Sequence, residues 1–277
     1  MRKTALAAGG FALVIALTGC GGGDDNASGN GSGGELSSPF GSAQELVRAA
    51  SAQTEKSKSS KFTFEMDMAG QKFSGNGEGL YDGDNTAMSM NMDVQGQTME
   101  MRIVDKVLYM KMPAQAGMTA DGKPWVKITP GGDDPISKSM GDSFDQMAEQ
   151  NDPSKTLEQI EKAGTITNTE QVELNGEQTT HYSVELDMKK LAEQMPDSPN
   201  AKAVEQMQGK IDTLPMELWL NSDQLPVQIV MDMSKIAEAA GQPQAGGQMT
   251  MKYTDWGAPV DVEAPPADQV GEFSMPK

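Results

Sequence analysis

The chain has 277 residues, and its 40 acidic residues against 22 basic ones give a net charge of −18 at pH 7. Such a surface repels nucleic acid and anionic lipid headgroups, so composition argues against a nucleic-acid partner and against membrane binding through charge. The length suits one large domain or two small ones, and 22 methionines with only 5% aromatic residues predict an unusually soft core.

The N-terminal residues have the pattern of a signal peptide that ends at a lipid-attachment site. Arg2 and Lys3 precede the apolar run 11–17, which is far shorter than the roughly 20 residues that span a bilayer. The run ends in Leu17-Thr18-Gly19-Cys20, which resembles a bacterial lipobox, and Cys20 is the only cysteine. The alternative is an ordinary signal peptide near a structural cysteine, but a lone thiol cannot form an internal disulfide. We therefore predict a signal peptide at 1–19 and a lipid anchor on Cys20, which places the protein on the outer face of the cell membrane.

A flexible tether and one folded domain are predicted after Cys20. Residues 20–40 are rich in Gly, Ser and Asn, a composition typical of a flexible coil. Strand patterns then occur on both sides of a helical interval, so residues 41–277 are expected to form a single α+β domain.

Helices are predicted from apolar stripes with spacings of three and four residues. The first covers 42–56, with Ser42 as its N-cap and Leu46, Val47 and Ala50 on its apolar side. Two more begin at Asp134-Pro135 and at Asp152-Pro153, and Gly164 is expected to end the second of these. Further helices are expected at 187–195 and 200–210.

Strands are predicted where apolar and polar residues alternate. The early runs form a meander with methionine on one face, and Asn175-Gly176 is a strong two-residue hairpin signal between 165–174 and 177–188. Later strands are expected at 214–221, at 226–233 and at "QMTMKY", followed by an extended, proline-rich terminal segment. Together these elements predict a single curved antiparallel sheet.

Catalytic residues are not predicted. Nucleophilic catalysis needs an activated side chain beside a base, and His181 is the only imidazole. The alternation of its strand directs His181 outward, as a solvated surface residue. The glycine-rich "SGNGEGLYDG" at 74–83 lacks the context of a phosphate loop and is read as a strand approached closely by a helix or ligand.

The alternating methionines allow three interpretations. Plain core packing explains them without any ligand, because Met fills irregular gaps. A cavity for lipid is the second, because flexible thioether side chains repack around varied ligands. A Cu(I) site is the third, although residues i and i+2 of a strand share a face without any metal.

Three stretches resemble a known family. They are "GEQTTHYSVELDMKKL" at 176–191, "LPMELWLNSDQLPVQIVMDM" at 214–233 and "MKYTDWGAPVDVEAPP" at 251–266, and each is similar to a matching stretch of the actinobacterial LppX/LprG-type lipoproteins. The resemblance implies a fold like that of the periplasmic Lol-type carriers, which have a half-open antiparallel barrel, helices over its concave face and an apolar cavity between them. It also implies binding and transfer of acylated lipids or glycolipids. The heavy use of methionine departs from the family, so ligand identity does not transfer.

The sequence therefore predicts a non-enzymatic envelope lipoprotein that holds acylated lipid beneath a curved half-barrel sheet. It predicts no cofactor and no metal ligand for this function, and it leaves an envelope protein partner open. The alternatives are a scaffold lipoprotein with a closed core and a Met-rich Cu(I) binder. The residues expected to line the cavity are Phe62, Phe64, Met66, Met88, Met90, Met92, Met99, Met101, Met110, Val184, Leu186, Met231 and Met249.

Overall fold

The computed structural model describes residues 39–68, 71–82, 86–94, 97–111, 122–129, 153–194, 209–239 and 241–272. The chain divides into a unit of residues 1–34 and a unit of residues 35–277, and the description below concerns the second unit alone. The predicted signal peptide, Cys20 and the helix expected behind Asp134-Pro135 lie outside the described residues, as does most of the helix expected at 200–210. No helix within the described ranges is both long and apolar enough to cross a bilayer.

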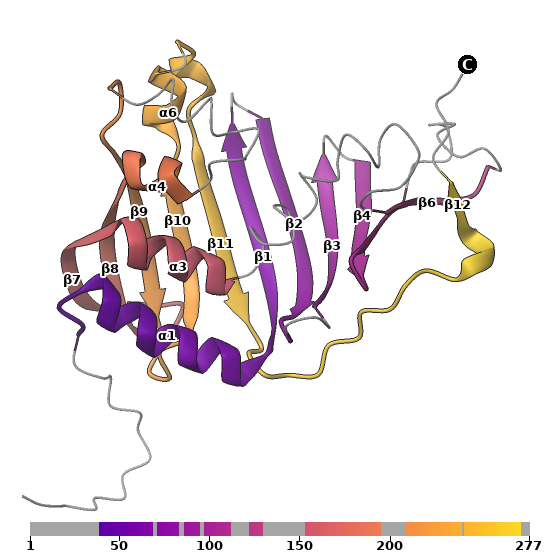
Figure 1. The fold of residues 1–277 in the computed structure, drawn as a ribbon, viewed down its shortest axis with the longest axis horizontal. Helices are drawn as coiled ribbons and strands as arrows, with labels where there is room; N and C mark the ends of the chain where they lie inside the picture. The colour runs from indigo at the N-terminus through magenta and orange to yellow at the C-terminus, as the bar shows by residue number, and fades with distance from the viewer. Residues whose placement is uncertain are drawn as a thin grey trace, which may run out of the picture. The chain divides into compact units, whose positions relative to one another are not determined.

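The described residues form one open sheet of twelve strands with helices packed against it, which confirms the α+β class (Figure 1). The strands lie in the order β12-β6-β5-β4-β3-β2-β1-β11-β10-β9-β8-β7. Their bounds are β1 Ser59–Met68, β2 Gln71–Leu80, β3 Ala87–Val94, β4 Gln97–Val104, β5 Val107–Lys111, β6 Trp125–Ile128, β7 Gly164–Leu174, β8 Glu177–Asp187, β9 Thr213–Leu220, β10 Pro226–Asp232, β11 Gln248–Thr254 and β12 Val270–Glu272.

The expectation of a purely antiparallel sheet is wrong at one edge. All neighbouring pairs are antiparallel except β12 and β6, where Val270 lies opposite Trp125 in a parallel register. Neither strand was predicted, because runs of three and four residues are too short to show a period of two.

The middle of the sheet joins two distant parts of the chain. Strand β1 pairs with β2 on one side and with β11 on the other, so that Phe62 lies opposite both Gly77 and Tyr253. The meander β1–β5 and the later strands β7–β11 are thereby united in one sheet.

Of the helices that the structure describes, the first three confirm predicted helices, and the last was not predicted. They are α1 Ala43–Ser57, α3 Pro153–Ala163, α4 Met188–Gln194 and α6 Ser234–Ala239. In α1 the Ser42 hydroxyl accepts a hydrogen bond from the Glu45 amide at 3.3 Å, and Leu46, Val47 and Ala50 are buried. Figure 1 shows α1 and α3 lying across one face of the sheet, where α1 and α3 contact β7, and α3 and α4 contact β8.

Helix α3 passes directly into β7 at Gly164. The helix ends at Ala163, as expected, but Gly164 is the first residue of the strand and not a left-handed cap. A side chain at this position would overlap the carbonyl oxygen of Ile160. Gly164 is therefore needed for close backbone approach.

The predicted hairpin between β7 and β8 is confirmed. Asn175 and Gly176 have φ values of 54° and 87°, the left-handed pair that a tight two-residue turn between twisted strands requires. The hairpin directs Tyr182, Val184 and Leu186 to the face that the helices cover, and all three are 1% exposed.

The opposite face of the sheet carries a cluster of charged residues around Glu100. Its carboxylate accepts hydrogen bonds from the Arg102 guanidinium at 2.6 and 3.1 Å and from the Lys111 ammonium at 3.1 Å. The Arg102 guanidinium in turn lies 5.0 Å from the ring centre of Trp125. Burial works to raise the pKa of Glu100, but the hydrogen bonds from Arg102 and Lys111 outweigh it, so the pKa is lowered.

This cluster predicts a contribution to stability that acid removes. A lowered carboxyl pKa stabilises the fold above the unfolded value of about 4.3, and the stabilisation is lost as the pH falls through the folded pKa. We expect Glu100→Gln to lower the free energy of unfolding by up to about 1 kcal/mol at pH 7 and by less near pH 3, measured by urea denaturation at both values. Glu65→Gln is the control, because the Glu65 side chain is 70% exposed and 4.0 Å from its Lys252 partner. Equal losses at both pH values would contradict the assignment.

Candidate functional site

The sheet register places all thirteen predicted lining residues on one face. Phe62 lies in line with Met90, Met101 and Met110 across β1–β5. Val184 lies in line with Met231 across β8–β10, in the other half of the sheet and on the same face. This is the face on which the side chains of β8 meet α3 and α4, and we call it the inner face.

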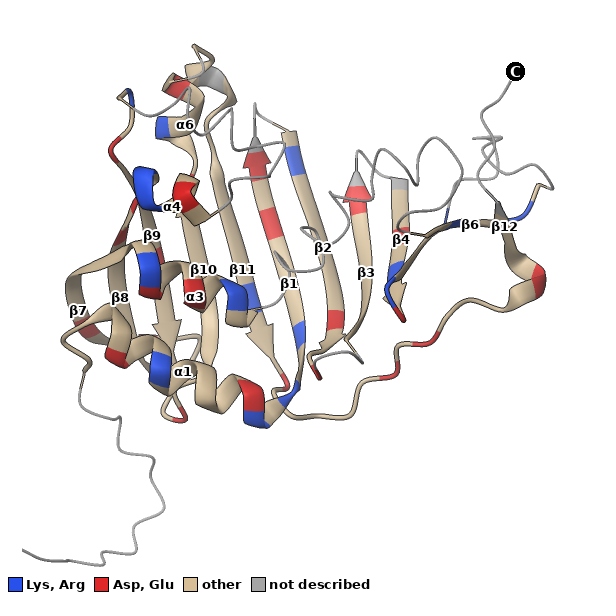
Figure 2. Cartoon of the chain, viewed as in Figure 1, with Lys and Arg blue, Asp and Glu red and all other residues tan. Residues whose placement is uncertain are grey.

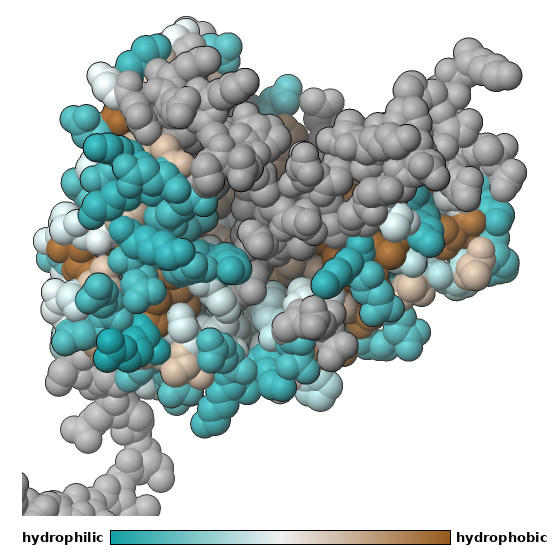
Figure 3. All heavy atoms as spheres, in the orientation of Figure 1, coloured by the Kyte–Doolittle hydropathy of each residue, from teal (hydrophilic) through white to brown (hydrophobic). Residues whose placement is uncertain are grey.

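Burial divides the thirteen residues into two groups. Phe62, Met88, Met90, Val184 and Leu186 are at most 8% exposed and belong to the hydrophobic core. The others are half-buried, namely Phe64, Met66, Met92, Met99, Met101, Met110, Met231 and Met249. The half-buried group is almost entirely methionine, so the part of the inner face that solvent reaches is mainly a thioether surface. Figure 3 shows hydrophobic residues at the surface over β4, β6 and β12.

Four methionines form an unbroken line across four neighbouring strands. Met216 of β9 lies opposite Met231 of β10, Met231 opposite Met249 of β11, and Met249 opposite Met66 of β1. We call these four residues the methionine row. Met216 is 1% exposed, whereas the other three are half-buried. The line continues into Phe73 of β2.

Some inner-face residues were not predicted as lining. Met216, Phe73 and Met251 belong to the same face by register. Met216 could have been found from the alternation of Leu214, Met216 and Leu218 in β9, and Met251 from its spacing of two from Met249 in β11. Phe73 becomes recognisable only through its cross-strand partner Met66.

The glycines of β2 are covered by aromatic rings of neighbouring residues. A methyl group at Gly75 would overlap the ring of Phe64, one at Gly77 would overlap the ring of Phe62, and one at Gly79 would lie 2.7 Å from the hydroxyl of Tyr81. The expectation that a helix or ligand approaches this stretch closely is therefore wrong. Rings from the same sheet occupy the space, as aromatic side chains do beside strand glycines.

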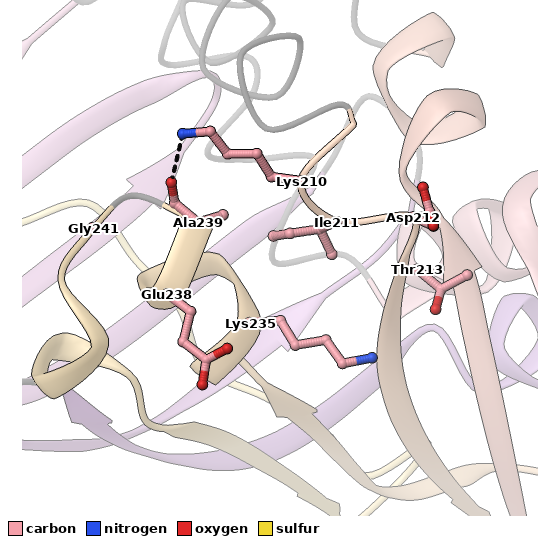
Figure 4. A pocket seen from close by; sticks show the side chains of 8 residues that line it. All are labelled: Lys210, Ile211, Asp212, Thr213, Lys235, Glu238, Ala239 and Gly241. Carbon is pink, nitrogen blue, oxygen red and sulfur yellow. Dashed lines mark hydrogen bonds between the residues drawn. The ribbon is translucent and has the colours of Figure 1, made fainter.

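Hollows in the described part of the chain have mixed walls of polar and apolar side chains. The first, of about 850 Å³, lies between α6 and the segment before β9, where the Lys210 ammonium donates to the carbonyl oxygen of Ala239 at 2.8 Å (Figure 4). The second, of about 560 Å³, lies beside α1 and Phe40. The third, of about 380 Å³, lies beside Gly75. The polar side chains that line it occupy positions between the inner-face residues of each strand and therefore belong to the outer face. An apolar cavity lined by the thirteen residues stays a prediction.

His181 is on the outer face, as predicted, but it is packed and not solvated. Its ring stacks on Trp219 with centroids 4.2 Å apart, and its side chain is 15% exposed. Its two ring nitrogens lie 3.0 Å from a Glu170 carboxylate oxygen and 2.6 Å from a Glu217 carboxylate oxygen. The ring therefore links β7, β8 and β9, and both of its nitrogens are already engaged.

Charged side chains of both signs are spread over the described elements. Figure 2 shows acidic and basic residues interspersed over the helices and strands. Within the described residues, no group of three His, Cys, Asp or Glu side chains is placed to hold a metal ion.

Known proteins resemble this chain in their solved structures but not in their sequences. No family model matches the chain, and no curated relative matches it in sequence. The fold is similar to that of LprF from Mycobacterium bovis, with a TM-score of 0.47 and 18% identity over 80% of this chain and 96% of that one. It is similar to the lipoprotein LppX from Mycobacterium tuberculosis, with a TM-score of 0.47 and 12% identity over 80% of this chain and 98% of that one.

A third similar structure is the Pseudomonas aeruginosa MucA/MucB complex, with a TM-score of 0.36 and 13% identity over 79% of this chain and 59% of that one. The first two of these structural neighbours, LprF and LppX, are mycobacterial lipoproteins of the LppX/LprG type, the family that the sequence itself resembles.

Proposed function

We propose that the chain is a lipoprotein anchored through Cys20 to the outer face of the cell membrane, and that its inner sheet face holds the acyl chains of a lipid or glycolipid. The observation that carries the proposal is the half-buried apolar group on the inner face, which includes Met66, Met92, Met99, Met231 and Met249. In this reading the sheet is a half-barrel, and the inner face is its concave side.

The physical basis is the transfer of hydrocarbon from water to an apolar surface. Each buried methylene contributes about 0.8 kcal/mol, so a chain of fifteen methylenes gains on the order of 12 kcal/mol. Methionine suits this task because its unbranched side chain adapts to ligands of different shape. No bond is made or broken, and the protein acts by sheltering and carrying.

A charge on the inner face tests the proposal, and strand β3 offers a matched control. Met92 faces inward beside Gly75 and Met99, and the adjacent Asn91 faces outward beside Asn76 and Glu100. Both variants, Met92→Lys and Asn91→Lys, add one positive charge at neighbouring positions. We expect Met92→Lys to lower the amount of co-purified acyl lipid at least tenfold, because a buried ammonium opposes hydrocarbon.

The measurement is quantitative mass spectrometry of lipid extracted from the Cys20→Ala chain and its two variants. The parent and Asn91→Lys should carry nearly one lipid per chain. Equal lipid in both variants would contradict binding at the inner face. A parent that carries none and ignores added lipid vesicles would leave the alternative of a scaffold lipoprotein with a closed core.

A further inference from the structure

The methionine row has a property that its sequence positions do not reveal. Spacings of two residues place thioethers on one face of each strand whether or not they bind anything. The alignment of Met66, Met231 and Met249 with Met216 comes instead from the registers of β9, β10, β11 and β1. Four thioethers are thus immediate neighbours across strands, without an intervening side chain of another kind.

The spacing of the row suits one soft metal ion. Neighbouring strands are about 4.8 Å apart, so the Cβ atoms of Met231, Met249 and Met66 follow one another at about this interval. Each sulfur is two bonds beyond Cβ on a freely rotating chain, and metal–sulfur bonds measure about 2.3 Å. The sulfurs of Met231 and Met66 can therefore turn toward that of Met249 and meet at one ion.

Met249 and Met66 have room to turn toward an ion, whereas Met231 is packed against the hydrophobic core. Met231, Met249 and Met66 are half-buried, so an ion can reach them from solvent, and neither Met249 nor Met66 is part of the hydrophobic core or packed against it. Met216 is buried beside them as a fourth donor. A second run, Met90–Met101–Met110, has only three donors, and Met90 is 8% exposed, which makes it the poorer site.

We propose that the methionine row is a binding site for a soft monovalent cation, Cu(I), held by the thioether sulfurs of Met231, Met249 and Met66 with Met216 behind them. Thioethers select Cu(I) because both partners are soft and polarizable. The net charge of −18 favours a cation over an anion at any site on this chain. The site shares Met66, Met231 and Met249 with the surface of the proposed lipid binding, so copper and lipid are measured separately.

The test measures Cu(I) affinity anaerobically, by competition with a chromophoric Cu(I) chelator, on the full chain carrying Cys20→Ala, which removes the only thiol. We expect one Cu(I) per chain, and at least tenfold weaker binding in Met249→Leu, which removes the central sulfur at nearly constant volume. Met188→Leu is the matched control, because Met188 is a buried methionine of α4 outside the row, and it should change the affinity less than twofold.

Two further readouts separate this proposal from others. X-ray absorption of the Cu(I) form should show sulfur neighbours, and His181→Gln should leave the affinity unchanged because His181 faces the other side of the sheet. Mass spectrometry of the lipid that co-purifies with Met249→Leu, beside its copper affinity, separates loss of copper from loss of lipid, because leucine removes the sulfur and keeps the apolar volume. Binding no tighter than to free methionine, unchanged affinity in Met249→Leu, or nitrogen neighbours in the absorption spectrum would overturn the proposal.

Discussion

Alanine in place of Gly77 is expected to lower the free energy of unfolding by about 2 to 3 kcal/mol. The added methyl group would lie 2.5 Å from Cζ of Phe62 and would overlap the backbone carbonyl oxygen of Ser89 on the neighbouring strand. The Phe62 ring cannot move away easily, because it is 3% exposed within the core. Strand β2 or the ring must shift, and the sheet loses packing at its centre.

Urea denaturation measures this loss, and two variants make the result specific. Gly41→Ala is the control, because nothing lies within 4 Å of a methyl group there, and it should change stability by less than about 0.5 kcal/mol. In the background of Phe62→Leu, which removes the ring, Gly77→Ala should cost distinctly less, because the two residues are coupled. Additive losses would show that the ring is not what excludes a side chain at Gly77.

Alanine in place of Leu218 is expected to lower the free energy of unfolding by about 3 to 5 kcal/mol. Leu218 is 0% exposed on the inner face of β9, where it lies between Tyr182 of β8 and Ile229 of β10. The substitution removes three carbons, one methine and two methyl groups. It leaves a cavity that the neighbouring strands cannot close, because backbone hydrogen bonds hold β9 to a strand on each side.

The neighbouring strand supplies the comparison for Leu218. Val230 of β10 is half-buried on the outer face, opposite Glu217 and Thr250, so Val230→Ala should cost about 1 kcal/mol or less. Thermal and urea unfolding of the two variants give the ranking directly. Similar losses at both positions would mean that the inner face is no better packed than the outer one.

Local patterns predicted most of the described elements because their signals lie within a few residues. Helix α1 followed from its stripe and its Ser42 cap, and the β7–β8 hairpin followed from Asn175-Gly176. Strands β6 and β12 and the six-residue helix α6 were missed, because elements this short repeat their pattern too few times for it to be recognised.

The candidate site was predictable as a set of residues but not as an arrangement. Alternation correctly put Met66, Met231 and Met249 on the side facing the helices. Their position side by side depends on the registers of β1, β10 and β11, which are set by pairing between distant segments and leave no trace in local spacing. The packing of His181 on Trp219 was missed for the same reason.

The pairing of β1 with β11 has a consequence for the order of assembly. During synthesis from the N-terminus, the chain can form the hairpins of β1–β5 first and those of β7–β10 later, because each of these strands pairs with a strand that is close to it in sequence. The two sub-sheets can join only when 248–254 arrives to hydrogen-bond with both β1 and β10, and β6 gains its outer neighbour only with 270–272. Until then β1 presents an unpaired edge, which invites association between nascent chains, so truncation just before Gln248 should yield aggregates and not a smaller folded protein.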